Sequence, residues 1–223
     1  MGVPILFRPL KEISELNQHG ALMDKAKLKK DIEILLIDDK DVPFLEFLTR
    51  NDYHIKHHND LTDFNLVKSF DIILCDVQGV GTSLSPTLQG AHIVKEIKKL
   101  YPFKQVIAFT ANPSDPDIVP HLHTADKFLS KDANEDEWID ALDNCIQKYS
   151  NPVKQWKEIR KMLLDCDVST KSVAHLESNF VKAIQSKNQD LFLNTQNDYP
   201  DISKHVWEIL GGLATLIKLF APS

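Results

Sequence analysis

Short apolar runs alternate with amphipathic segments along the middle of the sequence, and this alternation limits the folds open to the chain. The runs IEILLI, DIILC and QVIAF are almost continuously apolar rather than apolar at every second residue. Continuous apolarity is typical of strands buried on both faces of a parallel sheet. Helical periodicity separates the runs. The sequence therefore predicts an α/β fold with a doubly wound, five-stranded parallel sheet.

The alternating pattern occupies residues 31–150, and different sequence precedes and follows it. We expect strands over 32–37, 53–57, 71–76, 104–110 and 127–130, and helices over 42–51, 61–69, 88–100, 117–123 and 134–149. Residues 1–30 end in the basic run MDKAKLKK and are predicted to be an N-terminal extension with one helix. Pro152 breaks the pattern. Residues 151–223 are then predicted to form an all-α C-terminal domain of three helices, one of them capped by Ser169.

Composition narrows the classes of function. A net charge of −6 argues against a protein that grips nucleic acid through broad electrostatics. The three cysteines are widely spaced and form neither a disulfide framework nor a CxxC metal site. No apolar run reaches the roughly 18 residues of a membrane span. We expect a cytoplasmic protein that binds neither nucleic acid nor membranes.

Polar residues stand at the end of four of the predicted strands. Asp38 and Asp39 follow the first strand, Asp76 ends the third, Thr110 ends the fourth, and Lys131 follows the fifth. Ligands of open α/β sheets bind at the carboxyl ends of the strands, so these side chains are expected to meet. Three converging carboxylates favour a cation, and hard oxygen ligands favour Mg²⁺. A carboxylate beside a metal ion, an ammonium and a hydroxyl suits a phosphoryl acceptor.

The motifs ILLIDD, DIILCD, VIAFTA and KFLSKD, in this order, resemble the receiver domain of response regulators in bacterial two-component signalling. The resemblance covers residues 31–150. It implies a flavodoxin-like fold, phosphorylation by a histidine kinase or a phosphotransfer protein, and slow self-dephosphorylation. It implies a phosphoacceptor protein and not an enzyme.

The resemblance also assigns roles to individual residues. It implies that Asp76 is the phosphoacceptor, that Lys131 pairs with the phosphoryl group, and that Thr110 and Phe128 are the switch hydroxyl and the switch aromatic. It further implies that Mg²⁺ is held by Asp38, Asp39, Asp76 and the backbone carbonyl of Gln78. Two features depart from the family pattern: the loop VQGVGTSLSPTLQG is long, and Asp132 follows the lysine where proline is common, which argues against a cis peptide there.

Other interpretations of the same residues remain open. Asp38 and Asp39 could serve a turn and a helix N-cap instead of a metal. A degenerate receiver that keeps the shape without the chemistry would act as a constitutive interaction protein. The histidines of HIKHH and HLH lack cysteine or carboxylate partners at zinc-ligand spacing, which favours surface histidines.

The C-terminal region leaves the output of such a receiver undecided. One hypothesis is an interaction module whose phosphorylation changes what the helical region binds. A second is a phosphate reservoir that drains a histidine kinase, favoured by the absence of a recognisable output. A third is an atypical DNA-binding regulator, since STKSVAHLESNFVKAI faintly echoes a recognition helix. Nine basic against eight acidic residues from Asn151 onward disfavour this third hypothesis.

The last helical segment, within residues 203–223, is apolar almost all round. A helix of this kind has to be buried in something. The two preceding helices of the C-terminal region are expected to be too short to bury it on all sides, so the sequence predicts a homodimer formed through this helix. Removing residues 203–223 should then leave a soluble, monomeric receiver.

Overall fold

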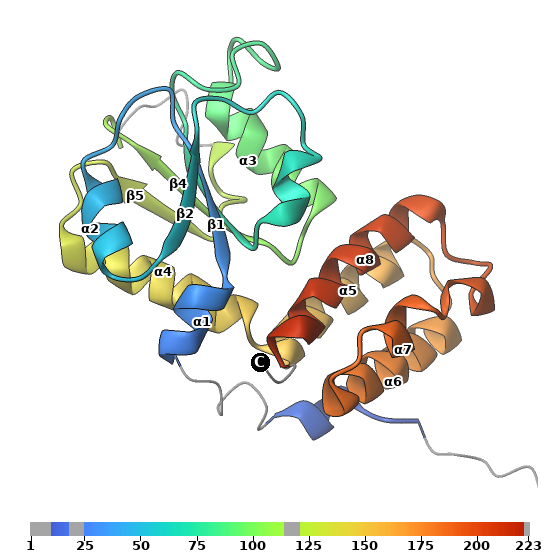
Figure 1. Ribbon diagram of the computed structural model, residues 1–223. Coiled ribbons are helices and arrows are strands. Elements are labelled where there is room, and N and C mark those ends of the chain that lie inside the picture. The colour runs from blue at the N-terminus through green and yellow to red at the C-terminus, as the bar shows by residue number, and fades with distance from the viewer. Residues whose placement is uncertain (1–9, 18–24, 114–120, 221–223) are drawn as a thin grey trace, which may run out of the picture.

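The structure is a computed structural model in which residues 10–17, 25–113 and 121–220 are described. Five strands form one sheet with helices on both of its faces (Figure 1). The strands are β1 (Glu33–Ile37), β2 (His54–His58), β3 (Ile72–Asp76), β4 (Gln105–Thr110) and β5 (Lys127–Ser130). All neighbours pair in parallel, in the order β2-β1-β3-β4-β5. This order is the flavodoxin-like, doubly wound arrangement, so the predicted fold class is confirmed.

Three helices enclose the sheet. Helices α2 (Phe44–Arg50) and α4 (Glu135–Tyr149) contact each other on one face, and α3 (Gln89–Leu100) packs on β3 and β4 from the other. Phe44 stacks on Trp138 with ring centroids 3.9 Å apart, and the ring of Phe109 meets both edge-on. These aromatic contacts lock α2, α4 and β4 together beneath the carboxyl ends of the strands.

One predicted helix of this unit is shorter than expected. The helix expected over 61–69 is reduced to the 3-10 turn η2 (Leu66–Ser69). Asp63 accepts hydrogen bonds from the backbone and the side-chain amide of Asn65. These local bonds compete with helical hydrogen bonds and explain the short turn. The helix expected over 117–123 lies largely outside the described residues.

The N-terminal extension contacts both parts of the molecule. Helix α1 (Lys25–Asp31) packs on β2, whereas the 3-10 turn η1 (Ile13–Leu16) packs on the C-terminal helices. The backbone amides of Lys11 and Ile13 donate to Ser178 Oγ and Glu177 Oε1, each at 3.0 Å. Leu16 is completely buried. Residues 11–16 therefore belong structurally to the helical region, a role that the sequence did not reveal.

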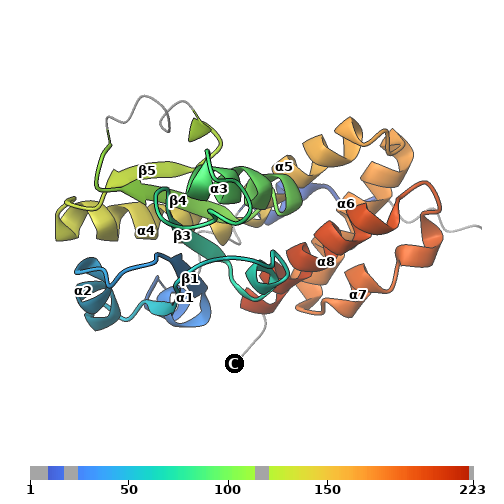
Figure 2. The ribbon, with the colours of Figure 1, turned by 90° about the horizontal axis from the view of Figure 1, so that it is seen from above.

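The C-terminal region contains α5 (Pro152–Asp165), α6 (Thr170–Ser186), α7 (Asp190–Leu193), the turn η4 (Gln196–Asp198) and α8 (Lys204–Leu219). Side chains of Asn151, Ser169 and Ser203 cap α5, α6 and α8. The cap predicted at Ser169 is confirmed, while α7 and η4 were not predicted. Figure 2 shows these helices beside the sheet rather than over either face of it.

Helix α8 is buried within its own chain. It contacts α5 and α7, and its Gly212 lies so close to Phe103 that an added Cβ would meet the ring at 2.6 Å. Eight of its apolar residues are at most 7% exposed: Val206, Trp207, Ile209, Leu210, Leu213, Ala214, Leu216 and Ile217. The argument that led to a homodimer assumed that the chain could not bury this helix, and that premise is wrong. The homodimer itself stays a prediction.

No helix in the described part of the chain has both the length and the apolarity needed to cross a bilayer.

Candidate functional site

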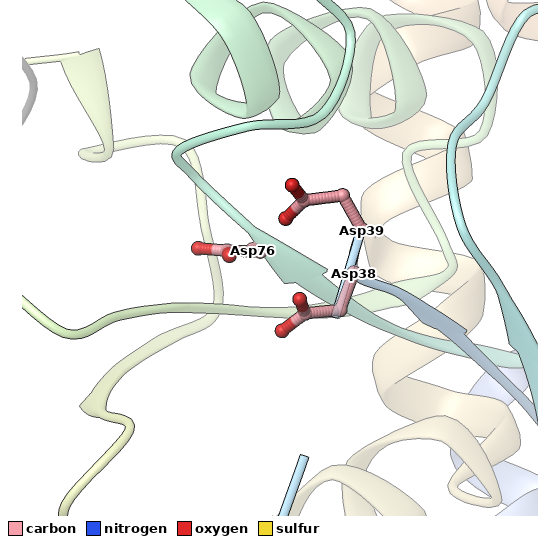
Figure 3. A group of neighbouring side chains, drawn as sticks. All are labelled: Asp38, Asp39 and Asp76. Carbon is pink, nitrogen blue, oxygen red and sulfur yellow. The ribbon is translucent and has the colours of Figure 1, made fainter. Parts of the chain in front are cut away.

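Three carboxylates meet at the carboxyl edge of the sheet, as expected from their positions at the ends of β1 and β3. Asp38, Asp39 and Asp76 each offer an oxygen within 4.8 Å of the others (Figure 3). Asp38 and Asp76 are buried, whereas Asp39 is exposed. The site lies where β1 and β3 are neighbours and their crossovers leave in opposite directions, the place where open α/β sheets bind ligands.

Lys131 reaches two of these carboxylates. Its Nζ lies 2.8 Å from Asp38 Oδ2 and 2.6 Å from Asp76 Oδ2. Its backbone N–H donates to Thr110 O at 2.8 Å, which extends the β4–β5 pairing to the lysine. The lysine reaches the site although Asp132 replaces the usual proline, and the described residues contain no cis peptide bond.

Burial and charge act against each other in this group. Burial raises the pKa of Asp76, and the Asp38 carboxylate adds to the rise, while the hydrogen bond from Lys131 offsets part of it. Burial alone would lower the pKa of Lys131, but its hydrogen bonds to Asp38 and Asp76 outweigh burial and raise it. One ammonium thus faces three carboxylates, and the site is short of positive charge.

Thr110, at the end of β4, is placed beside the loop that follows Asp76. Its Oγ1 lies 3.2 Å from Gln78 Oε1 and accepts the Asn112 N–H at 3.2 Å. The Gln78 N–H donates to Asp76 Oδ1 at 3.2 Å. The hydroxyl is therefore brought to the site as predicted. Binding of a metal by the Gln78 carbonyl stays a prediction.

Phe128 lies on β5 opposite Ala108 and is half-buried. It stands three residues before Lys131, and its strand pairs with β4, which ends at Thr110. Its role as a switch stays a prediction.

Two glycines shape the site, and sequence reasoning missed both. Gly79 has φ +90°, and a Cβ there would lie 2.7 Å from Asp39 Oδ1. A Cβ on Gly90 would lie 1.9 Å from Asp76 O, so only glycine lets α3 approach the end of β3. The sequence signal that could have found these glycines is their position, three residues after Asp76 and at the start of a helix.

The surroundings of Asp38 and Asp39 bear on the alternative roles of these residues in a turn and a helix N-cap. Asp38 Oδ1 does accept the Lys40 N–H at 2.9 Å, as in a turn. The residue at the N-cap of α2 is Pro43, however, so neither Asp38 nor Asp39 caps that helix. His57 Nε2 lies 2.8 Å from Asp38 O, beside the site. Among the described residues, Asp38, Asp39 and Asp76 form the one group with metal-ligand geometry.

The residues fit a small, hard cation. The three donors are all carboxylate oxygens, they lie within one coordination sphere of one another, and one of them is open to solvent. Asp38, Asp39 and Asp76 are the side chains that would hold Mg²⁺. A bound Mg²⁺ would supply the positive charge that these carboxylates lack and could hold oxygens of an anionic ligand.

Solved structures similar to this chain are receiver domains. The beryllofluoride-activated NtrC4 receiver domain dimer is 22% identical, with 52% of this chain and 98% of that chain covered and a TM-score of 0.44. A CheY-like receiver domain protein from Methanospirillum hungatei JF-1 is 19% identical, with 53% and 95% covered and a TM-score of 0.44. A receiver domain protein from Clostridium thermocellum is 24% identical, with 60% and 98% covered and a TM-score of 0.42.

No family model matches the chain, and neither does any curated protein. The flavodoxin-like fold stands on the observed strand order and register, independently of these similarities.

Proposed function

We propose that the chain is a two-component receiver protein that accepts a phosphoryl group on Asp76 in the presence of Mg²⁺. The observation that carries the proposal is the meeting of Asp38, Asp39, Asp76 and Lys131 at one edge of the sheet. The donor is a histidine kinase or a phosphotransfer protein in the cytoplasm.

The residues divide the chemistry among them. A carboxylate oxygen of Asp76 forms the new bond to phosphorus while the bond from phosphorus to the donor atom breaks, and its electron pair leaves with the donor. The Lys131 ammonium, 2.6 Å from Asp76 Oδ2, is positioned to pair with oxygens of the transferred group. The Thr110 hydroxyl can donate to another of these oxygens. Attack of water on phosphorus would release inorganic phosphate and restore the carboxylate.

The experiment is phosphorylation by acetyl phosphate, followed by intact mass. We expect uptake with Mg²⁺ and none with a chelator, and Asp76→Asn should abolish it. Asp132→Asn is the matched control, because Asp132 is exposed and has no part in the cluster, and it should be labelled like the wild type. Equal labelling of Asp76→Asn would show that the acceptor is another residue.

Two outputs are compatible with this chemistry. They differ in whether the helical region changes when the receiver is phosphorylated. A reservoir needs no change outside the receiver, whereas an interaction module must change the helical region on phosphorylation. Hydrogen exchange of α5–α8 with and without beryllofluoride distinguishes the two. Gly212 of α8 packs closely against Phe103, so the helical region is in contact with the receiver, and this contact favours the interaction module.

A further inference from the structure

The one proton of the Thr110 hydroxyl is engaged in a hydrogen bond within the described structure. It accepts the Asn112 N–H, and it donates to Gln78 Oε1, each at 3.2 Å. A threonine hydroxyl has one proton to donate. Thr110 is 1% exposed, so water does not readily replace these partners. Before the hydroxyl can donate to anything else, its bond to Gln78 has to break.

The loop that carries Gln78 is held on both sides of it. The Gln78 N–H donates to Asp76 Oδ1 at 3.2 Å, and the Gly79 N–H donates to Gln89 Oε1 at 2.8 Å. Further along, the Gly81 N–H donates to Asp60 Oδ1 at 2.6 Å. These bonds fix the backbone from which the Gln78 side chain projects. The surrounding hydrogen bonds therefore hold Gln78 in position to contact Thr110.

We propose that the Gln78 side chain is a latch that holds the Thr110 hydroxyl in the unphosphorylated state and thereby weakens the site's hold on a phosphoryl group. This inference rests on the proposed function. The single proton of the hydroxyl cannot serve both Gln78 and a phosphoryl oxygen. The free energy of the Gln78–Thr110 bond is consequently lost when the hydroxyl turns to the phosphoryl group, and the phosphorylated state is disfavoured by that amount.

A latch and a purely structural role of Gln78 predict opposite changes in ligand affinity when the residue is replaced. If Gln78 only supported the loop, its replacement would loosen the site and weaken ligand binding. If Gln78 is a latch, its replacement removes a bond made in one state only, and binding becomes tighter. The backbone carbonyl of residue 78 is retained in every side-chain variant, so a metal contact from it would be unaffected.

The test is titration of wild type and Gln78→Leu with beryllofluoride at saturating Mg²⁺, followed by calorimetry. We expect Gln78→Leu to bind about three- to tenfold more tightly, the range that corresponds to loss of one intramolecular hydrogen bond. Gln78→Ala is a second variant that should shift affinity in the same direction. The Asn112 N–H signal, followed by NMR, should shift in both variants because its acceptor is the freed hydroxyl.

Thr110→Val supplies the decisive control, since it removes the hydroxyl while keeping the shape. In that background Gln78→Leu should leave beryllofluoride affinity unchanged. Equal or weaker binding by both Gln78 variants, or an equal gain in the Thr110→Val background, overturns the latch. A wild type that binds no beryllofluoride overturns the proposed function, and the latch with it.

Discussion

A carboxylate lies at each end of strand β3, Asp71 directly before it and Asp76 at its last residue, and the two have different surroundings. At the amino edge, Asp71 accepts from Tyr149 Oη at 2.5 Å and from the Glu33 N–H at 3.0 Å, one bond to each oxygen. At the carboxyl edge, Asp76 shares the Lys131 ammonium with Asp38. The chain itself satisfies the first cluster, which is structural. The second cluster has three carboxylates against the Lys131 ammonium, so its negative charge is only partly balanced by the described residues.

The pKa shifts of two lysines, one at each edge, show the same contrast. Lys104, at the amino edge, is 1% exposed and contacts the carbonyls of Lys68 and Phe70, so burial lowers its pKa to about 8. Lys131 is also held in the protein, yet its pKa is raised because its partners are carboxylates. The charge of the partners, and not burial alone, decides the direction of the shift.

The largest expected loss of stability comes from removing helix α8, which packs at the amino edge of the sheet. Helix α8 covers Phe103, which is 1% exposed and precedes Lys104. Removing residues 203–223 would expose the partners of eight buried apolar residues, each worth about 1.5–3 kcal/mol when large. Such a loss is comparable to the whole of the roughly 5–15 kcal/mol that stabilises a domain. We expect an aggregating or partly unfolded protein, not the soluble receiver that the sequence suggested.

Thermal unfolding and size-exclusion chromatography measure this effect. Leu210→Asp, at a completely buried position, should reproduce much of the loss, while Lys218→Gln on the exposed side of α8 should not. A truncated protein that stays monomeric and melts cooperatively near the wild-type temperature would show that α8 is dispensable and would restore the case for an intermolecular role.

A smaller change in the free energy of unfolding is expected when pH is raised and Lys104 loses its proton. The pKa of Lys104 is about 8 in the folded state against 10.5 as its ordinary value, so between these pH values the unfolded state binds more protons. The free energy of unfolding should therefore rise with pH, by about 1.5 kcal/mol between pH 8 and 9.5. Lys131 does not contribute in this window, because its stabilising charge is lost only above pH 10.5.

Denaturant unfolding at both pH values, on wild type and Lys104→Met, isolates the contribution of Lys104. The variant matters because burial raises the pKa of the Cys145 thiol to about 12, which makes the folded state lose stability over the same range. Cys145 is present in both proteins, so its effect cancels in the difference. A difference between the two proteins that does not change with pH would mean that folding does not lower the pKa of Lys104.

The sequence predicted the carboxyl edge better than the amino edge, and the reason is physical. The ends of parallel strands coincide, so finding the apolar runs was enough to bring Asp38, Asp76 and Lys131 together. The burial of α8 depends on Phe103, more than a hundred residues away in the sequence, and no local pattern reports such a contact.

Within the site, the contacts of the loop after β3 were likewise not predictable from local sequence patterns. The need for glycine at position 79 arises from the Asp39 carboxylate, and the need at position 90 from the Asp76 carbonyl. Gln78 meets Thr110 only because that loop folds back over the end of β4. Such contacts between distant segments follow no helical or strand periodicity. The order of the motifs therefore predicted the candidate ligand residues but not the loop residues that position them.

The smallest expected effect on stability comes from Asp39→Asn, and it sharpens the contrast between the two edges. Asp39 is exposed and adds a third negative charge to a group that has one ammonium. Neutralising it should leave the metal-free protein as stable as the wild type or slightly more stable, because like charges repel. Mg²⁺ affinity should fall at least about tenfold, since few protein oxygens hold this ion. Titration with Mg²⁺ and thermal unfolding of the same samples measure both effects, with Asp41→Asn as the matched exposed control. Unchanged Mg²⁺ affinity in Asp39→Asn would remove Asp39 from the metal site, and a marked loss of metal-free stability would make the carboxyl edge as structural as the amino edge.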